Sequence, residues 1–379
     1  MTGPEATPIE RRLARLFGDD GARGPGTGWI SGVVAVFLGA TSAGAVLVLH
    51  FPDLLTTADL RAHYSLPVMR ALIEVVIGIA FLASCLSLLL RRRKALGLTG
   101  LGLTLLAVVA GGAGVEIRGD LDGSVHFGLD WFLLNLLVFA LVFVPVERAF
   151  PLKPGQRVLR AGWSTDLAYF FVNHVGVQVL TFLSLWPATA IAALPALEGT
   201  ARAVSSQPVW LQVIELMVAA DLVQYAVHRA FHRVPVLWRF HAIHHSIREM
   251  DWLAGSRLHL VDVVLTRALV VLPAFALGFS EPALYLWLVI IGMQAVINHL
   301  NLRFRLRWLE HFVVTPRFHY WHHAARPVDR NFAVHFPWID RLFGTHHLPA
   351  GEWPEELGIE GHPVPAGYLD QLYHPFRRS

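Results

Sequence analysis

The sequence predicts an all-α integral membrane protein, a helical bundle of about six to eight transmembrane segments with a histidine-rich helical region on its cytoplasmic side. Hydrophobic residues make up 54% of the 379 residues and charged residues only 16%, a composition too apolar for a soluble protein. Several apolar segments reach the roughly 20 residues that a helix needs to cross a bilayer. Of the 20 histidines, the four that precede residue 228 are His50, His63, His126 and His174. The other histidines therefore gather in the second half of the chain.

Apolar segments long enough to span a bilayer begin near the amino terminus. The first four candidates are Trp29 to Phe51, Val68 to Leu90, Ala95 to Val115 and Gly128 to Val146. The stretch from Leu167 to Leu197 fits one tilted span or a broken pair. The remaining apolar runs are Val209 to Val227, Val261 to Phe279 and Ala283 to Ile297.

Basic residues in short loops predict how the chain is oriented. Arg91 to Lys94 are four consecutive basic residues after the second apolar segment, so this loop should be cytoplasmic. Alternation from this loop puts every histidine cluster at the cytoplasmic face. Richness in Ala, Gly and Leu, without a recognisable carboxy-terminal retrieval signal, favours a bacterial inner membrane over the endoplasmic reticulum. We expect a cytosolic tail (1–28), a membrane region of four apolar segments (29–150), a histidine-rich domain (151–348) and a cytosolic carboxy-terminal tail (349–379).

Charge and cysteine content exclude two classes of protein. The 31 basic residues exceed the 28 acidic residues by only three, so the chain lacks the basic excess typical of a nucleic-acid-binding protein. Cys85 is the single cysteine and lies in an apolar run, so no intramolecular disulfide can form.

The histidines form three short clusters and one isolated position. The first cluster is an HRxxH motif, His228 to His232, and the other two are HxxHH motifs, His241 to His245 and His319 to His323. Histidines four residues apart lie on one face of a helix, and a third at i+3 lies beside them. His299 follows the last apolar segment by itself.

This many imidazoles in one region indicates a metal centre. Protonated rings would repel one another, and burial of unpaired neutral rings is costly. A four-coordinate zinc ion uses four ligands, and a six-coordinate ion cannot use eight. Two metal ions that share eight or nine histidine nitrogens fit the count. Imidazole suits zinc, copper, iron and nickel alike, so the spacing leaves the metal open.

Two other functions for such histidines remain as alternatives. A zinc-dependent membrane hydrolase of the HExxH type needs a glutamate base after the first histidine, but Arg229, Ala242 and Tyr320 hold that position in the three clusters. A membrane metal transporter should place its ligands at bilayer depth inside the spans, whereas these clusters follow helix ends and polar segments.

The order HRxxH, HxxHH, an isolated Asn-His and HxxHH resembles the fatty acid hydroxylase/sterol desaturase superfamily of integral membrane non-haem di-iron oxygenases. The resemblance covers about half of the chain, from Trp163 to His347. The supporting motifs are Trp163-Ser164-Thr165-Asp166-Leu167, Ser256-Arg257-Leu258-His259, Thr315-Pro316-Arg317-Phe318-His319 and the segment Trp338 to Thr345. The four apolar segments ahead of the motifs depart from the usual pattern, and we assign them no function.

The resemblance implies an oxidoreductase that uses O2 to hydroxylate or desaturate a lipid of the sterol or fatty acyl type. The implied cofactor is a pair of iron ions, which zinc can replace during purification, in the domain 151–348. The implied iron ligands are His228, His232, His241, His244, His245, His299, His319, His322 and His323. His259 is a weaker candidate for a ligand or a pocket residue. Asp221 and Asp340 are candidates to orient a ligand histidine, and we predict no catalytic residue beyond the ligands.

Electrons must come from a separate protein. The sequence has no cytochrome b5-like haem-binding segment, no Gly-rich dinucleotide fingerprint after a strand and no cysteine set for an iron–sulfur cluster. We therefore expect the membrane, a lipid substrate, O2 and an electron donor as partners, the donor being cytochrome b5-like or a ferredoxin with its reductase.

Overall fold

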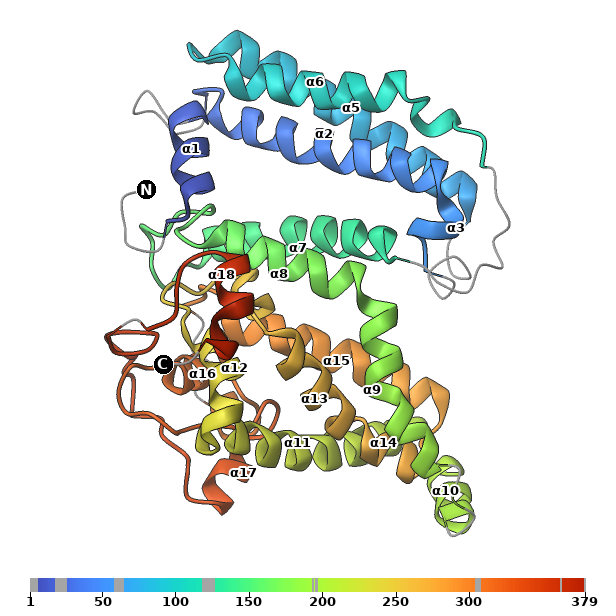
Figure 1. The fold of residues 1–379 in the computed structure, drawn as a ribbon, viewed down its shortest axis with the longest axis vertical. Coiled ribbons are helices and arrows are strands. Elements are labelled where there is room, and N and C mark those ends of the chain that lie inside the picture. The colour runs from blue at the N-terminus through green and yellow to red at the C-terminus, as the bar shows by residue number, and fades with distance from the viewer. Residues whose placement is uncertain are drawn as a thin grey trace. The chain divides into compact units, whose positions relative to one another are not determined.

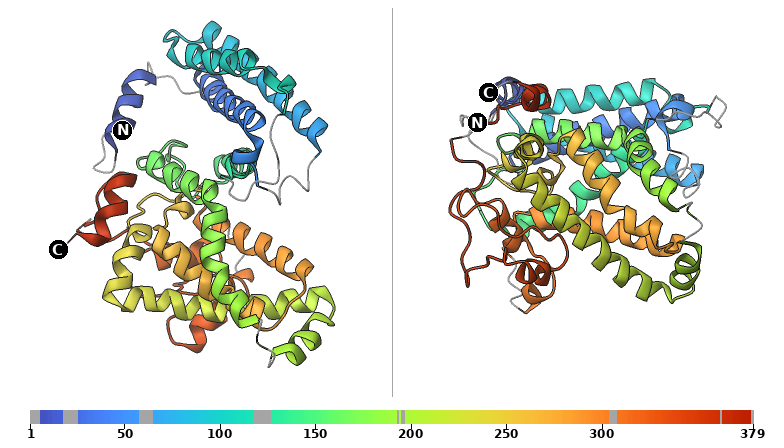
Figure 2. Two further views of the ribbon diagram at one scale, coloured as in Figure 1. Left: turned by 45° about the vertical axis from the view of Figure 1, so that its right-hand side comes forward. Right: turned by 60° about the horizontal axis from the view of Figure 1, so that its bottom comes forward.

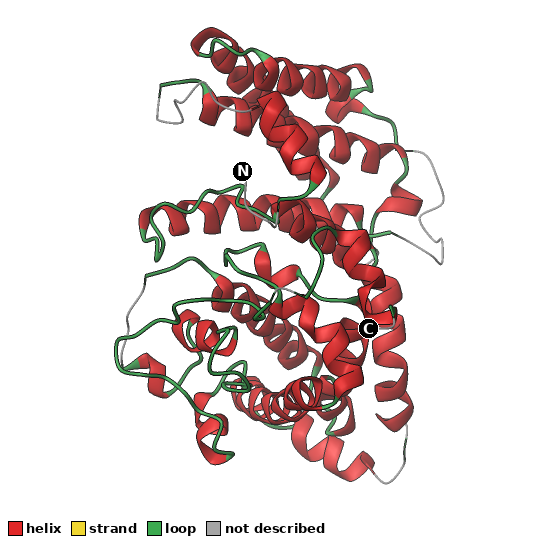
Figure 3. Ribbon diagram, turned by 60° about the vertical axis from the view of Figure 1, so that its left-hand side comes forward, coloured by secondary structure: helices red, strands yellow, loops and turns green. Residues whose placement is uncertain are grey.

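The computed structural model describes residues 6–17, 26–57, 65–117, 127–192, 194, 197–303, 308–361 and 363–377. Within these ranges the regular elements are helices, joined by loops and two isolated bridges, Pro151 with Leu302 and Ala324 with Leu357 (Figure 3). The predicted tail 1–28 lies partly outside the described residues. The chain forms two compact units, residues 1–139 with 174–178 and residues 140–173 with 179–379.

The first unit is built on a bundle of three long helices (Figure 1). Its elements are α1 (Pro8–Phe17), α2 (Trp29–His50), α3 (Pro52–Leu55), α5 (Leu66–Leu90), α6 (Ala95–Val109) and the short 3₁₀ helix η1 (Gly112–Gly114). Helices α2, α5 and α6 pack against one another. A Cβ on Gly100 would lie 2.6 Å from the Cβ of Ala35. Glycine therefore allows α2 and α6 to approach closely.

The second unit carries the histidines. After α7 (Leu129–Ala149), which begins in the first unit and ends in the second, the elements are α8 (Trp163–Val175), α9 (Val177–Ala192), α10 (Glu198–Ser205), α11 (Val209–Arg233), α12 (Pro235–His245), η3 (Ala254–Ser256), α13 (Leu260–Val270), α14 (Leu272–Ala276), α15 (Glu281–His299), η4 (Leu309–His311), α16 (Pro316–His322), α17 (Pro337–Leu342), α18 (Tyr368–Tyr373) and η5 (His374–Phe376). Helix α11 packs against α12, α13 and α15, and α15 packs against α16 (Figure 1 and Figure 2).

Six of the described helices are long and apolar enough to cross a membrane, which confirms the predicted fold class of a multi-pass, all-α membrane protein. They are Trp29–His50, Leu66–Leu90, Ala95–Gly114, Leu129–Ala149, Val209–Arg233 and Glu281–His299. The stretch predicted as one tilted span or a broken pair is a pair of helices bent by 56°, and it brings the number to seven if it crosses once.

Most predicted apolar segments agree with the helices to within a few residues, and two differ in ways that affect the histidine region. Helix α11 continues past Val227 to Arg233, so the HRxxH motif is its last turns. The segment from Val261 to Phe279 divides at Val271 into α13 and α14, because Pro273 in the first turn of α14 has no N–H to continue the preceding helix. Neither half reaches the length of a span.

Prolines and a buried aromatic cluster fix the helices around the histidines. Pro235 and Pro316 stand in the first turns of α12 and α16, where a fixed φ and a missing N–H are tolerated. Only Val234 separates α11 from α12. Phe318 and Phe332 are buried in one core cluster with Tyr225 of α11. The last turns of α11, α12, α15 and α16 therefore meet in one buried region.

Candidate metal centre

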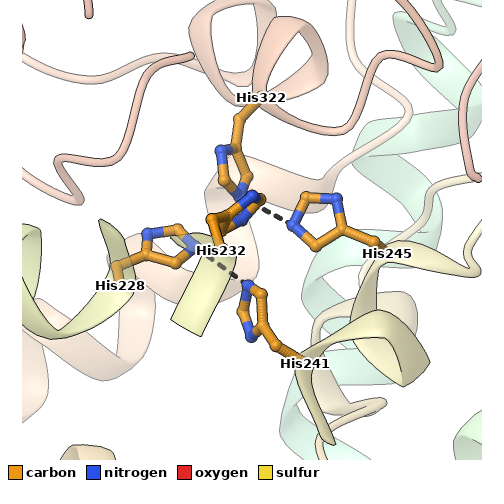
Figure 4. A group of neighbouring side chains, drawn as sticks. All are labelled: His228, His232, His241, His245 and His322. Atoms are coloured by element: carbon orange, nitrogen blue, oxygen red, sulfur yellow. Dashed lines mark hydrogen bonds between the residues drawn. The ribbon is translucent and has the colours of Figure 1, made fainter. Parts of the chain in front are cut away.

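The nine predicted ligand histidines form two groups. Within each group, the ligand nitrogens all lie within 4.8 Å of one another. The five-histidine group consists of His228, His232, His241, His245 and His322. The four-histidine group consists of His244, His299, His319 and His323. All are buried except the half-buried His232. Figure 4 shows the rings of the five-histidine group pointing toward a common centre.

Helical spacing explains how the histidines divide between the groups. In each HxxHH motif the first and last histidines, four residues apart, join one group, because they share a helical face. The middle histidine joins the other group. On α12, His241 and His245 belong to the five-histidine group and His244 to the four-histidine group. The assignment is reversed on α16, where only His322 belongs to the five-histidine group. Both motifs therefore contribute to both groups.

Four pairs of ring nitrogens lie unusually close, Nε2 to Nε2. The pairs are His228 with His241 at 3.1 Å, His245 with His322 at 3.0 Å, His244 with His323 at 3.1 Å and His299 with His319 at 3.1 Å. The two histidines of each pair come from different helical segments. The tertiary fold, not local sequence, brings these nitrogens together.

The hydrogen bonds of the Nδ1 atoms show which tautomer two of these rings adopt. His228 Nδ1 donates to the Phe332 carbonyl at 2.8 Å, and His241 Nδ1 donates to Asp262 at 2.7 Å. A neutral imidazole has one N–H, so both Nε2 atoms of this pair carry lone pairs. Two lone pairs 3.1 Å apart repel unless a cation lies between them. Among the residues that the structure describes, the buried Nε2 of His232 also has no hydrogen-bond partner. This donor set fits a metal ion.

Burial keeps the rings outside the spans in the neutral form that binds metal. Desolvation, followed by the charges of neighbouring histidines, holds their pKa well below the ordinary value, so they are unprotonated at neutral pH. The rings concerned are His244, His245, His319, His322 and His323.

Two carboxylates that sequence analysis missed contact the histidines directly. Asp262 accepts from His241, and Asp329 accepts from His232 Nδ1 at 3.3 Å. A carboxylate on the outer nitrogen fixes the tautomer and the orientation of a ligand ring. Asp262 had one signal in the sequence, a negative charge in a mostly apolar run that also contains Arg267. Asp329 lies in a loop without a pattern, and its partner comes from a helix 97 residues earlier.

Asp221 and Asp340, the two carboxylates that the sequence suggested, contact the backbone of a loop and not a histidine ring. Asp221 accepts the backbone N–H groups of residues 334–336, at 2.8 to 3.0 Å. Asp340 accepts those of Phe332 and Ala333, both at 2.8 Å. Together they hold the loop whose Phe332 carbonyl receives the His228 N–H. Each carboxylate positions a ligand through the backbone and does not touch a ring.

His259 lies outside both groups. Its Nδ1 accepts the N–H of Val261 at 3.1 Å and so caps the first turn of α13. Its Nε2 then donates to the Leu372 carbonyl of α18 at 3.1 Å. The structure therefore gives this residue a capping contact, and the predicted ligand or pocket role finds no support in its position.

A buried network of ion pairs holds the segment that contacts His244 of the four-histidine group. Arg160 pairs with Asp251 at 2.9 Å and with Asp166 at 2.5 Å, and Arg257 pairs with Asp166 at 2.5 Å. The Arg257 carbonyl accepts from His244 Nδ1 at 3.2 Å. The Trp163 to Leu167 motif thus contributes Asp166, which fixes the segment that orients His244.

Comparisons with known proteins agree with the motifs. The family model for fatty acid hydroxylase matches residues 213–345. An ornithine lipid hydroxylase of Rhizobium tropici is 30% identical over 255 residues, which cover 66% of this chain and 76% of that protein. Methylsterol monooxygenase 1 of Gallus gallus is 22% identical over 222 residues, 57% of this chain and 72% of that protein.

A Delta(7)-sterol 5(6)-desaturase of Gibberella zeae is 29% identical over 150 residues, 38% of this chain and 44% of that protein. No solved structure gives a significant match. The matched residues include all nine histidines of the two groups. The resemblance that the sequence motifs indicated is confirmed, and the chain belongs to the fatty acid hydroxylase/sterol desaturase superfamily.

Proposed function

We propose that this protein is a non-haem di-iron oxidoreductase that uses O2 to hydroxylate or desaturate a membrane lipid. The observation that carries the proposal is the pair of histidine groups, in which neutral Nε2 atoms face one another at 3.0 to 3.1 Å. Nine nitrogens exceed what one zinc or iron ion can bind. The relatives support a lipid substrate, since their names specify ornithine lipid and sterols.

In this proposal, residues of the chain orient the ligand rings and exclude water from the metal sites. Bound iron would supply the oxidising power needed to attack an unactivated C–H bond. The Nδ1 contacts to Asp262 and the Phe332 carbonyl fix two rings before any metal binds. The rings of Phe332 and Trp238 lie 5.0 and 5.1 Å from that of His232, where their apolar surface excludes water from the five-histidine group.

The arrangement favours an oxygenase over the two alternatives. The histidines occupy the carboxy-terminal ends of α11, α12, α15 and α16, and a transporter would carry its ligands along the interior of its spans. A hydrolase of the HExxH type would need a carboxylate base beside the metal ligands, and Arg229, Ala242 and Tyr320 hold that position.

The cellular setting is part of the same proposal. We place the histidine clusters on the cytoplasmic face of a bacterial inner membrane, on the evidence of the basic loop Arg91 to Lys94 and the composition. Residues 151–348 form the catalytic domain, between the membrane region 29–150 and the tail 349–379. Electrons come from a separate donor, either a cytochrome b5-like protein or a ferredoxin with its reductase.

The test is metal content and product formation in one set of variants. Purified under anaerobic conditions, the wild-type protein should hold about two iron ions per chain, and cells that express it should form a hydroxylated or desaturated lipid that depends on O2. His244→Ala and His322→Ala each remove a ligand from a different group, so both should lose iron and product. His50→Ala, in α2 of the first unit, is the matched control and should lose neither.

Zinc in the purified protein calls for reconstitution with ferrous iron before the count is made, because zinc binds the same ligands. If no preparation binds metal, and both variants form the same lipids as the wild type, the proposal is wrong.

A further inference from the structure

The two histidine groups differ in what holds the outer nitrogens of their rings. In the five-histidine group the acceptors are two carboxylates and two backbone carbonyls, namely Asp262, Asp329, Phe332 and Arg330. In the four-histidine group, within the part of the chain that the structure describes, the acceptors are the carbonyls of Arg257 and Ala295. The buried Nδ1 of His323 has no partner there.

The five-histidine group also has more negative charge close to its rings than the four-histidine group. Asp262 and its partner His241 have side chains only 5% exposed, so water screens that carboxylate little. Asp329 is a second carboxylate at this group, but it is 27% exposed and also pairs with Arg233 at 3.3 Å, which offsets part of its charge. The network behind the four-histidine group, Arg160, Arg257, Asp166 and Asp251, contains two positive and two negative side chains, whose formal charges cancel. Among the described residues, a carboxylate therefore contacts a ligand ring directly in the five-histidine group and not in the four-histidine group.

We infer that the two metal sites are not equivalent, and that Asp262 and Asp329 make the five-histidine group the tight site while the four-histidine group holds the exchangeable ion. The inference rests on the proposed function, since it assumes one metal ion in each group. A carboxylate on the outer nitrogen raises the basicity of the imidazole and fixes its direction, and its loss typically costs 10- to 100-fold in metal affinity or activity. A carbonyl orients the ring but brings no charge.

The local structure makes Asn a clean substitution at both carboxylates. Asp262 lies in the first turn of α13, where it also accepts the Thr266 hydroxyl at 3.0 Å. Asn keeps the volume and one acceptor oxygen but removes the charge. Asp329 has a φ of 60°, a left-handed conformation that Asn adopts as readily as Asp. Neither change requires the backbone to move.

The experiment measures how fast iron leaves the intact protein. The detergent-purified protein is loaded with ferrous ion under anaerobic conditions and mixed with a chelator that colours on binding ferrous iron. The wild type should release its iron in two phases of similar amplitude. His299→Ala, which removes a ligand of the four-histidine group alone, should abolish the fast phase and leave the slow phase.

Asp262→Asn should then speed the slow phase by about 10-fold or more and leave the fast phase unchanged. Asp329→Asn should act in the same direction by a smaller factor, because its bond to His232 is longer, at 3.3 Å, and more exposed. Thr266→Val is the matched control: it removes a hydrogen bond from Asp262 but keeps the charge, so the slow phase should barely change. Asp370→Asn, a surface carboxylate paired with Arg377, should have no effect.

The outcomes separate this inference from the proposed function. Two ions that leave in one phase would overturn the inference and leave the di-iron proposal standing, and so would an Asp262→Asn variant that speeds only the fast phase. An equal effect of Thr266→Val and Asp262→Asn would show that packing of α13, not charge, holds the ion, and would also overturn it. A protein that binds no iron under any condition would contradict both.

Discussion

The two units of this protein are stabilised by different kinds of contact. In the first unit, the core cluster is apolar, with Val46, Leu49 and Ile73 among its members, and buried hydroxyls such as those of Ser84 and Thr104 bond to carbonyls of their own helices. In the second unit, buried arginines, carboxylates and histidines bond to one another across elements far apart in sequence. The first unit therefore relies mainly on apolar packing, although Arg70 and Ser87 also bond to carbonyls outside their helix, whereas the second unit adds an extended network of buried charged and polar partners.

This difference predicts how each unit responds to change. An apolar helix contact can relax around a misfit, so that the cost is graded. A buried polar network loses a full desolvation penalty when one partner disappears. We therefore expect small, local effects in the first unit and large, cooperative effects in the second. Three measurements test this, in decreasing order of expected effect.

The largest effect should come from acid acting on the metal-free protein. The unfolded pKa of a histidine is about 6.5, whereas burial holds the pKa of His244, His245 and His322 well below the ordinary value. Below the unfolded pKa, the unfolded chain binds protons that the folded rings do not, so the free energy of unfolding falls as pH falls, until the folded pKa is reached. Each such ring contributes up to about 1.4 kcal/mol per pH unit.

Thermal unfolding of the iron-free protein in detergent, from about pH 7 to about pH 5, measures this slope. His323→Phe removes one titrating ring of similar shape and should make the slope shallower. A melting temperature that does not depend on pH over this range would contradict the assignment of these rings as buried and neutral.

The second effect comes from removing one member of the buried ion network. Asp166→Ala leaves Arg160 and Arg257 without the carboxylate that joins them, and loss of one partner of a buried pair costs about 3–5 kcal/mol. Because the Arg257 carbonyl orients His244, bound metal should fall along with stability. The check is the melting temperature together with bound metal per chain, and a variant unchanged in both would show that the network supports neither the fold nor the four-histidine group.

The smallest effect should come from overpacking the first unit. Gly100→Val places a side chain where a Cβ already lies 2.6 Å from the Cβ of Ala35, and such overpacking costs about 1–3 kcal/mol. Gly102→Val, two residues along the same helix, meets nothing within 4 Å and is the matched control. Both variants should keep their bound metal, since the histidines lie in the other unit. Loss of bound metal from Gly100→Val alone would show that the two units are coupled.

Sequence patterns predicted the histidines because their information is local. The spacing of HRxxH and HxxHH follows from one helical turn, and His299 stood out after the last apolar segment before the resemblance supported it, so all nine rings could be named before the fold was known. The division into two groups also follows from geometry, once i and i+4 are separated from i+3. The lengths of the spans followed from apolar composition for the same reason, although the extension of α11 to Arg233 did not, because its last turns are polar.

The supporting groups could not be predicted, because their partners are distant in sequence. Asp262 meets His241 across 21 residues and Asp329 meets His232 across 97. Asp221 and Asp340 stood out in the sequence, but their carboxylates bind the amides of the loop 332–336, a contact that exists only after α11 and α17 have packed. His259 lies in a motif of the family, yet its imidazole caps a helix. A residue type indicates chemistry, and only the tertiary structure assigns the partner.

Helix α11 is unbroken over 25 residues, from Val209 to Arg233, so it extends about 37 Å and ends in two of the histidines. The remaining three rings of that group come from α12 and α16, which are too short to span a bilayer. A thinner or thicker bilayer changes the tilt of a spanning helix at modest cost. Lipid thickness therefore acts directly on the two rings of α11 and reaches the other three only through the packing of α12 and α16 on the spanning helices, so the host membrane should influence how closely the five rings come together.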